Sequence, residues 1–259
     1  MYSVDTGGWL FLFFLDGRFT YSRRRGAKIQ PRSERILGTR LTKMVVIKRY
    51  TDEQLNFLKL TTLVVDEFSK ALRQTFKHMW DNVGSGPIWD DSEGVRNLFS
   101  GLEGSNSKVP TTESYKRWDC TALFQATIYA KVFSLLDSKG NLKTLSELYV
   151  KPRGFMPNGS FHTSVLSTGG NDAETLALAI DQLRLLRNSI IHSASSEMDK
   201  TTFDRYIELA KDAFDALGVA TDSIDAVGSW NESHFPTGEV DRLKRNICLM
   251  AVSTGVLFD

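Results

Sequence analysis

Three polar side chains that suit phosphate chemistry stand near the end of the apolar segment LRLLRNSIIH, residues 183–192: Arg187, Asn188 and His192. Histidine titrates near neutral pH, so it can accept and return a proton during catalysis. The planar guanidinium of Arg187 can hold a phosphate, and Asn188 can orient His192 or donate to a phosphate oxygen. Such a set fits the cleavage of RNA by its own 2′-hydroxyl, which needs a base, an acid and a cation. We therefore take these three residues as the candidate catalytic residues.

The spacing of these residues leaves a second interpretation open. Around an ideal helix, Arg187 and His192 point about 140° apart, so one straight helix does not bring both onto one ligand. The same residue types are also typical of a helix end. There an arginine interacts favourably with the helix dipole, an asparagine begins the unwinding, and a histidine caps the last turn.

The helical wheel places Leu178 and Leu185 with Asn188 and His192 on the outer face, opposite the apolar core face. A helix that packs on both sides is the simplest account, and an exposed apolar pair indicates a partner surface. We therefore expect a homodimer through this face. A twofold axis would bring a second His192 and so supply both the acid and the base. The other histidines are expected to have surface or structural roles: His78, His162 and His234.

The composition is ordinary for a soluble globular protein, with 259 residues, 41% hydrophobic and 24% charged, and a formal net charge of +1. With so little net charge, any contact with RNA must be local. The two cysteines, Cys120 and Cys248, show neither a disulfide framework nor zinc-ligand spacing, which favours a reducing, cytoplasmic compartment. We expect no metal and no cofactor, because the sequence has neither a Gly-rich phosphate loop nor a metalloprotease motif.

The chain divides into three parts by composition. Residues 1–43 are expected to form a basic, weakly ordered N-terminal arm, whose apolar run GWLFLFFL is too short to cross a bilayer, so no membrane contact is expected. Regular apolar patterning begins after Met44 and indicates one helical domain over 44–220. Residues 221–259 are expected to form a C-terminal extension, and within it residues 230–259 begin as a coil and end in an apolar tail.

Capping residues and apolar spacing of three and four residues predict helices over 51–83, 95–102, 118–136, 172–191 and 199–217. Thr51 and Gln54 form a capping-box pattern, and Asn171 or Asp172 is expected to cap the fourth helix. A long loop is expected over 149–170, where glycines and prolines gather. The prediction is an all-α fold, a bundle of four to five helices whose apolar faces bury one another.

Three motifs, followed by a closing amphipathic helix, closely resemble the HEPN superfamily: WDCTALFQATIY, GFMPNG and LRLLRNSIIHS. The resemblance covers about residues 118–217, and its most specific part is Arg187-Asn188-x3-His192, an R-x4-H pattern. It implies a HEPN-like helical bundle and frequent dimerisation. In active members it also implies cleavage of RNA without a metal ion.

Two functions follow as expectations. The first is a dimeric, metal-independent endoribonuclease that uses Arg187, Asn188 and His192 on RNA. The second is a non-catalytic module that binds RNA or a protein partner within a signalling or ubiquitin-related assembly. Cleavage of RNA in the presence of EDTA distinguishes the first from the second.

Overall fold

The structure, a computed structural model, describes residues 49–83, 86–104, 107–157 and 159–254, so the predicted arm over 1–43 lies outside the described residues. The described part is mainly helical, with eight α-helices and one small antiparallel hairpin, which confirms the all-α class. No helix in it is long and apolar enough to span a membrane. The helices are α1 (Asp52–Thr62), α2 (Phe68–Val83), α3 (Glu93–Glu103), α4 (Cys120–Ala126), α5 (Asp172–Ile191), α6 (Lys200–Ala216), α7 (Asp222–Ser229) and α8 (Thr237–Thr254).

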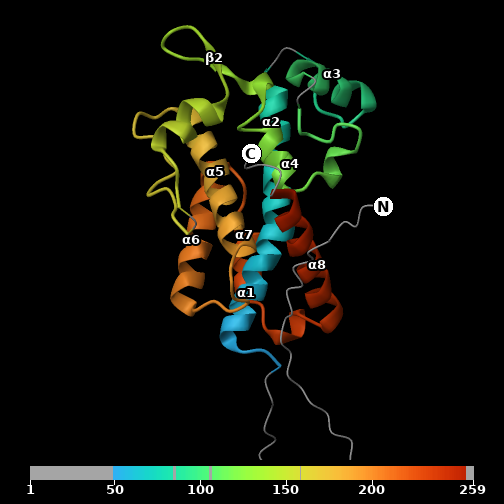
Figure 1. Ribbon diagram of the computed structural model, residues 1–259, viewed down its shortest axis with the longest axis vertical. Coiled ribbons are helices and arrows are strands. Elements are labelled where there is room, and N and C mark those ends of the chain that lie inside the picture. The colour runs from blue at the N-terminus through green and yellow to red at the C-terminus, as the bar shows by residue number, and fades with distance from the viewer. Residues whose placement is uncertain (1–48, 84–85, 105–106, 158, 255–259) are drawn as a thin grey trace, which may run out of the picture. The chain divides into compact units, whose positions relative to one another are not determined.

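A continuous helical path formed by α1 and α2 runs through the middle of the fold (Figure 1). It begins at the predicted capping box, where the Thr51 hydroxyl accepts from the Gln54 N–H and the Gln54 side chain accepts from the Thr51 N–H. Between α1 and α2 the path widens into a π-helical turn, Leu63–Glu67. There the thiol of Cys120 in α4 donates to the carbonyl of Val64 and contacts the hydroxyl of Ser69. The thiol therefore links α4 both to this turn and to the start of α2.

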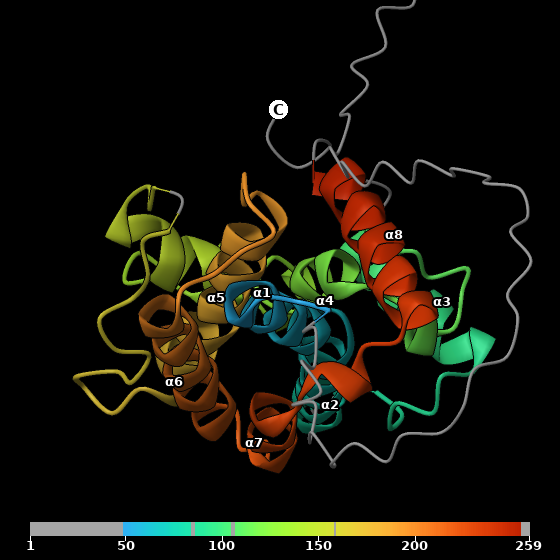
Figure 2. The same cartoon turned by 90° about the horizontal axis from the view of Figure 1, so that it is seen from below.

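The other helices pack around this central path. Figure 2 shows α5, α6, α7 and α8 surrounding α1, and α5 and α6 lie against each other. Of the two predicted candidates for the cap of α5, Asn171 is the one that caps it, and Asp199 caps α6. Gly218 ends α6 with a φ of 65°. Large apolar side chains of the central path, α4 and α6 are fully buried in the core: Leu60, Leu63, Phe68, Phe76, Leu123 and Phe214.

The helix predicted over 118–136 is much shorter than expected. α4 stops at Ala126, because Thr127 leaves the helical region with φ −114° and ψ −92° and donates its hydroxyl back to the carbonyl of Leu123. A two-stranded hairpin follows, with β1 (Leu135–Leu136) paired to β2 (Leu142–Lys143). The apolar spacing was compatible with a helix, but the local hydrogen bond of a threonine competes with the helix ladder.

A carboxylate from a distant element fixes the chain after α4. Glu103, at the end of α3, is buried and accepts the backbone N–H groups of Lys131 and Val132 at 3.0 and 2.8 Å. These two groups begin the short 3-10 turn that leads into β1. Because the contact spans 28 residues, local patterning does not reveal it.

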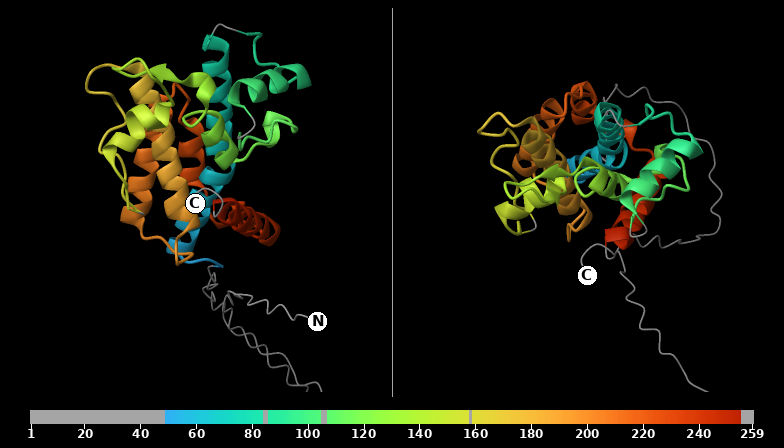
Figure 3. Two further views of the ribbon diagram at one scale, coloured as in Figure 1. Left: turned by 45° about the horizontal axis from the view of Figure 1, so that its top comes forward. Right: turned by 90° about the horizontal axis from the view of Figure 1, so that it is seen from above.

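The described part of the predicted C-terminal extension, residues 221–254, is mostly helical. These residues fold into α7 and α8 and belong to the same compact unit as α1 to α6, so the predicted boundary at 220 is absent. Figure 3 shows α8 on the side of the central path opposite α6. Arg242 of α8 forms two hydrogen bonds with the carboxylate of Asp66 at 3.2 and 2.8 Å. With α7 and α8 added, the bundle has more helices than the predicted four to five. The HEPN-like arrangement of the bundle stays a prediction.

Candidate functional site

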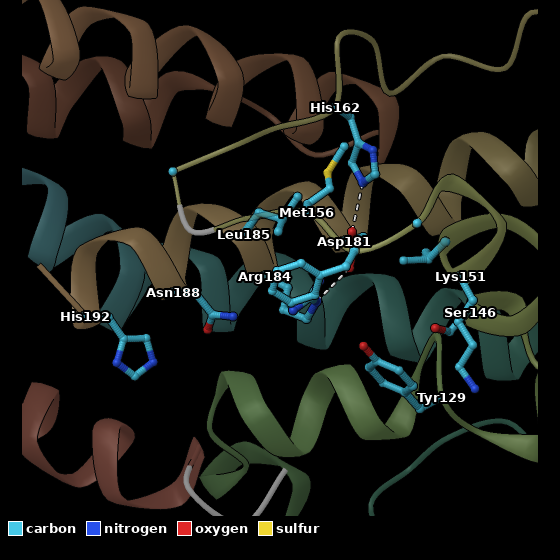
Figure 4. Close-up of a pocket in the computed structure, with 14 residues that line it drawn as sticks. Tyr129, Ser146, Lys151, Met156, His162, Asp181, Arg184, Leu185, Asn188 and His192 are labelled. Atoms are coloured by element: carbon cyan, nitrogen blue, oxygen red, sulfur yellow. Dashed lines mark hydrogen bonds and ion pairs between the residues drawn. The ribbon is translucent and has the colours of Figure 1, made fainter. Parts of the chain in front are cut away.

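One side of α5 carries three polar side chains at four-residue spacing: Arg184, Asn188 and His192. Four residues turn an α-helix by about 400°, so the three lie along one side and follow each other at about 6 Å. Figure 4 shows them in this order, with His192 at the end of the helix. His192 is the C-cap residue of α5 and is exposed. We call these three residues the donor row.

The donor row lines a cleft of about 450 Å³. The opposite side of this cleft comes from the chain that connects α4 to α5, which was predicted to be a long loop over part of its length. The connection contributes both polar and aromatic groups to the lining: Tyr129, Ser146, Lys151, Phe155 and His162. Burial raises the pKa of the Tyr129 phenol, so this group stays protonated and can donate.

Arg187 lies outside the cleft. Its side chain is 1% exposed, and its Nη2 donates to the hydroxyl of Thr121 in α4 at 2.9 Å and to the carbonyl of Met250 in α8 at 3.1 Å. Its Nη1 donates to Oδ1 of Asn188 at 3.0 Å. Burial lowers the pKa of Arg187, and no carboxylate forms an ion pair with it within the described residues. The structure therefore places Arg187 as a brace between three helices.

The predicted set of Arg187, Asn188 and His192 is thus divided. Asn188 and His192 line the cleft, whereas Arg187 points between α4 and α8. The helical wheel had predicted this separation of Arg187 from His192. The arginine that shares a side with His192 is Arg184, which the sequence interpretation did not select. Its position was readable in the sequence, because Arg184 precedes Asn188 by the same four residues that separate Asn188 from His192.

A buried network holds Arg184 in place. Asp181 is 1% exposed, accepts from Nε of Arg184 at 2.6 Å, and bonds to Nε2 of His162 at 2.8 Å. Burial would raise the pKa of Asp181, but the hydrogen bond from His162 and the charge of Arg184 outweigh it, so the pKa is lowered. The backbone N–H of His162 also donates to the side chain of Gln182. His162 therefore fastens the connection to α5, a structural role that agrees with the expectation.

Several donors of the cleft remain available to a ligand. Arg184 uses only its Nε on Asp181, and its two terminal nitrogens have no hydrogen-bond partner within the described residues. Asn188 accepts from Arg187 through Oδ1, which leaves its Nδ2 as a donor. Lys151 is largely exposed, and its nearest carboxylate oxygen, on Glu147, is 3.9 Å away. The cleft therefore presents cationic and amide donors suited to an anion.

The predicted dimer face is wrong in one respect. Leu178 is 0% exposed and belongs to the core, and Leu185 is 6% exposed and lines the cleft, so neither is an exposed apolar residue. α5 does pack on both sides, but its second partner is the connection from the same chain, including the π-helical turn Ser146–Val150. The outer face therefore offers no apolar pair to a second copy.

No cysteine is among the described residues that line the cleft. The described part of the chain contains no group of three or more His, Cys, Asp or Glu side chains that could hold a metal ion. Burial raises the pKa of the Cys120 thiol to about 11, so this group stays protonated at neutral pH and is a poor nucleophile. Binding of an anion through the donor row is the chemistry that the cleft suits best.

Comparisons with protein-family models, with curated proteins and with solved structures found no match for this chain. The HEPN resemblance therefore stays an expectation from the sequence motifs. The cleft beside α5 is the basis of the functional proposal.

Proposed function

We propose that this chain is a HEPN-like RNA-binding protein that holds the phosphate backbone of RNA in the cleft beside α5. The donor row carries this proposal: Arg184, Asn188 and His192 present donors at about 6 Å intervals along one side of a helix. A row of regularly spaced donors suits a polymer of regularly spaced phosphates. Phosphate contacts of this kind supply most of the affinity of proteins for nucleic acids.

The charge of the cleft agrees with an anionic ligand. Its described lining holds two permanent cations, Lys151 and Arg184, against one carboxylate, Asp181. Asp181 is buried and already paired, so it presents little negative charge to the opening. The net charge of the whole chain is only +1, so the attraction for RNA has to be local, as the composition requires.

Binding is favoured over cleavage for a single chain. Cleavage through the 2′-hydroxyl needs a base and an acid at one phosphate. The two histidines that line the cleft, His162 and His192, are far apart, because His162 is bonded to Asp181 and eleven residues of α5, about 16 Å, separate Asp181 from His192. Arg187, the other predicted catalytic group, is committed to α4 and α8.

Fluorescence anisotropy with a labelled RNA oligonucleotide in EDTA tests the proposal. Reversing the charge of Lys151, as in Lys151→Glu, should weaken binding about tenfold and reduce the dependence on salt by one to two ions. The side chain is exposed, so the fold should be unaffected. Lys200→Glu is the matched control, since Lys200 is an exposed lysine on α6 that does not line the cleft.

Two outcomes would change the proposed function. If the wild-type protein shows no binding of RNA at low salt, or if Lys200→Glu weakens binding as much as Lys151→Glu, the cleft is not an RNA site. If the wild type cuts the RNA in EDTA and His192→Ala does not, the endoribonuclease becomes the better function. Gel analysis of the same samples reports cleavage beside binding.

A further inference from the structure

Phe155 is an aromatic side chain that the fold presents to solvent at the cleft. It is 89% exposed, the highest value among the large hydrophobic residues that the structure describes, and it contributes to the lining. The residue before it, Gly154, has φ 84° and ψ 178°, a conformation that residues with a Cβ rarely adopt. The short 3-10 turn Lys151–Arg153 ends there, so a sharp turn of the backbone carries the Phe155 ring outward.

The surroundings of Phe155 suit one flat ring better than a protein surface. The core of a protein interface needs several apolar side chains together. Phe155 is the exposed large hydrophobic of the described lining, because the other apolar residues there are half-buried or buried: Val150, Met156 and Leu185. A largely exposed cation, Lys151, also lines the cleft. An exposed aromatic ring in a cleft that also holds cationic groups is the usual arrangement for stacking a base while its phosphates are held nearby.

We infer that Phe155 stacks on an unpaired base of the RNA whose backbone lies along the donor row, and that the ligand is single-stranded RNA. This inference rests on the proposed function. In a double helix the bases are paired and stacked on each other, so a side chain reaches their faces only in loops, bulges and ends. The cleft volume of about 450 Å³ is that of a pocket for a small ligand, which fits a short piece of one strand. Because every base has a face that can stack, little sequence preference is expected.

Binding of one labelled RNA strand, alone and annealed to its complement, tests this inference on the full chain. Phe155→Leu keeps an apolar side chain of similar size but removes the ring, and should weaken binding of the single strand about tenfold. Binding of the duplex should not change. Phe155→Trp should retain or strengthen the binding of the single strand. Leu166→Ala is the matched control, because Leu166 is 62% exposed on the same connection but lies outside the cleft lining.

Photo-crosslinking gives a readout that separates stacking from general apolar contact. With 5-iodouridine in the single strand, long-wavelength ultraviolet light should produce an adduct that mass spectrometry maps to Phe155. If the wild type binds the single strand and Phe155→Leu binds it equally well, the inference is overturned and the ring is left for a protein partner. Equal affinity for duplex and single strand would overturn it as well. Failure of the proposed function is distinguishable, since the wild type would then bind neither RNA.

Discussion

Replacing Arg187 tests the difference between a bracing residue and a catalytic one. In Arg187→Ala the carbonyl of Met250 and the hydroxyl of Thr121 lose the hydrogen bonds that Arg187 donates to them. In Arg187→Met a side chain of similar length fills the same space without a charge. The first variant opens a cavity between α4, α5 and α8, and the second does not.

The expected change in the free energy of unfolding of Arg187→Ala is the sum of two losses and one gain. Two interhelix hydrogen bonds from a charged donor contribute about 1.5–3 kcal/mol each, and an unfilled cavity costs about 2 kcal/mol more. Removing a buried cation returns several kcal/mol, since the charge of Asp119 offsets the desolvation of Arg187 only in part. The balance for Arg187→Ala is a loss of about 3 kcal/mol, which lowers the melting temperature of a domain of this size by about 6–12 °C. Arg187→Met should lose about 1 kcal/mol or less, because a volume-matched apolar residue replaces a buried charge.

Thermal unfolding followed by circular dichroism measures both variants, with Arg245→Ala as the control at an exposed arginine on α8. Hydrogen exchange should become faster in α8 of Arg187→Ala, because the contact to Met250 is lost. If Arg187→Ala unfolds at the same temperature as Arg245→Ala and hydrogen exchange in α8 is unchanged, Arg187 does not hold the helices together. If Arg187→Met keeps its stability but loses RNA binding, the guanidinium contacts the ligand and the structural interpretation fails.

Two further predictions concern the other buried groups of α5. Asp181→Asn should lose about 3 kcal/mol at pH 7 by urea unfolding, because it breaks a buried ion pair. The pKa of Asp181 in the folded protein lies below its ordinary value, so its contribution to the free energy of unfolding is complete above about pH 4 and is lost as the pH falls through the lowered pKa. The difference in stability between Asp181→Asn and the wild type should therefore shrink at pH 3. A difference that stays constant with pH would contradict this. Leu178→Ala should cost about 2–5 kcal/mol of stability, because Leu178 lies in the core. If Leu178→Ala is instead as stable as the wild type and has a changed sedimentation coefficient, the predicted dimer face is supported again.

The helices that local signals define were predictable from the sequence, and the connections between them were not. The caps at Thr51, Asn171 and Asp199 are contacts over three residues, so the residue types reveal them directly. The end of α4 and the position of β1 depend on Thr127 and on Glu103 from α3, and the second of these is a long-range contact. The apolar spacing of three to four residues is the same whether or not such a contact forms, so this spacing alone does not show where α4 ends.

The candidate site shows the same division. The helical wheel placed Asn188 and His192 together and Arg187 apart from them, and the structure agrees. On that wheel Arg184 lies about 40° from Asn188, so the donor row was within reach of the sequence once the R-x4-H pattern was set aside. The wheel could not show what covers the outer face of α5. In the structure the connection from α4 to α5 folds back over part of this face, where His162 bonds to Asp181 and Leu185 lines the cleft. The same fold-back makes the cleft, since it sets Lys151 and Phe155 opposite the donor row. The segment that removes the basis for the predicted dimer face therefore supplies the second wall that a ligand of the donor row requires.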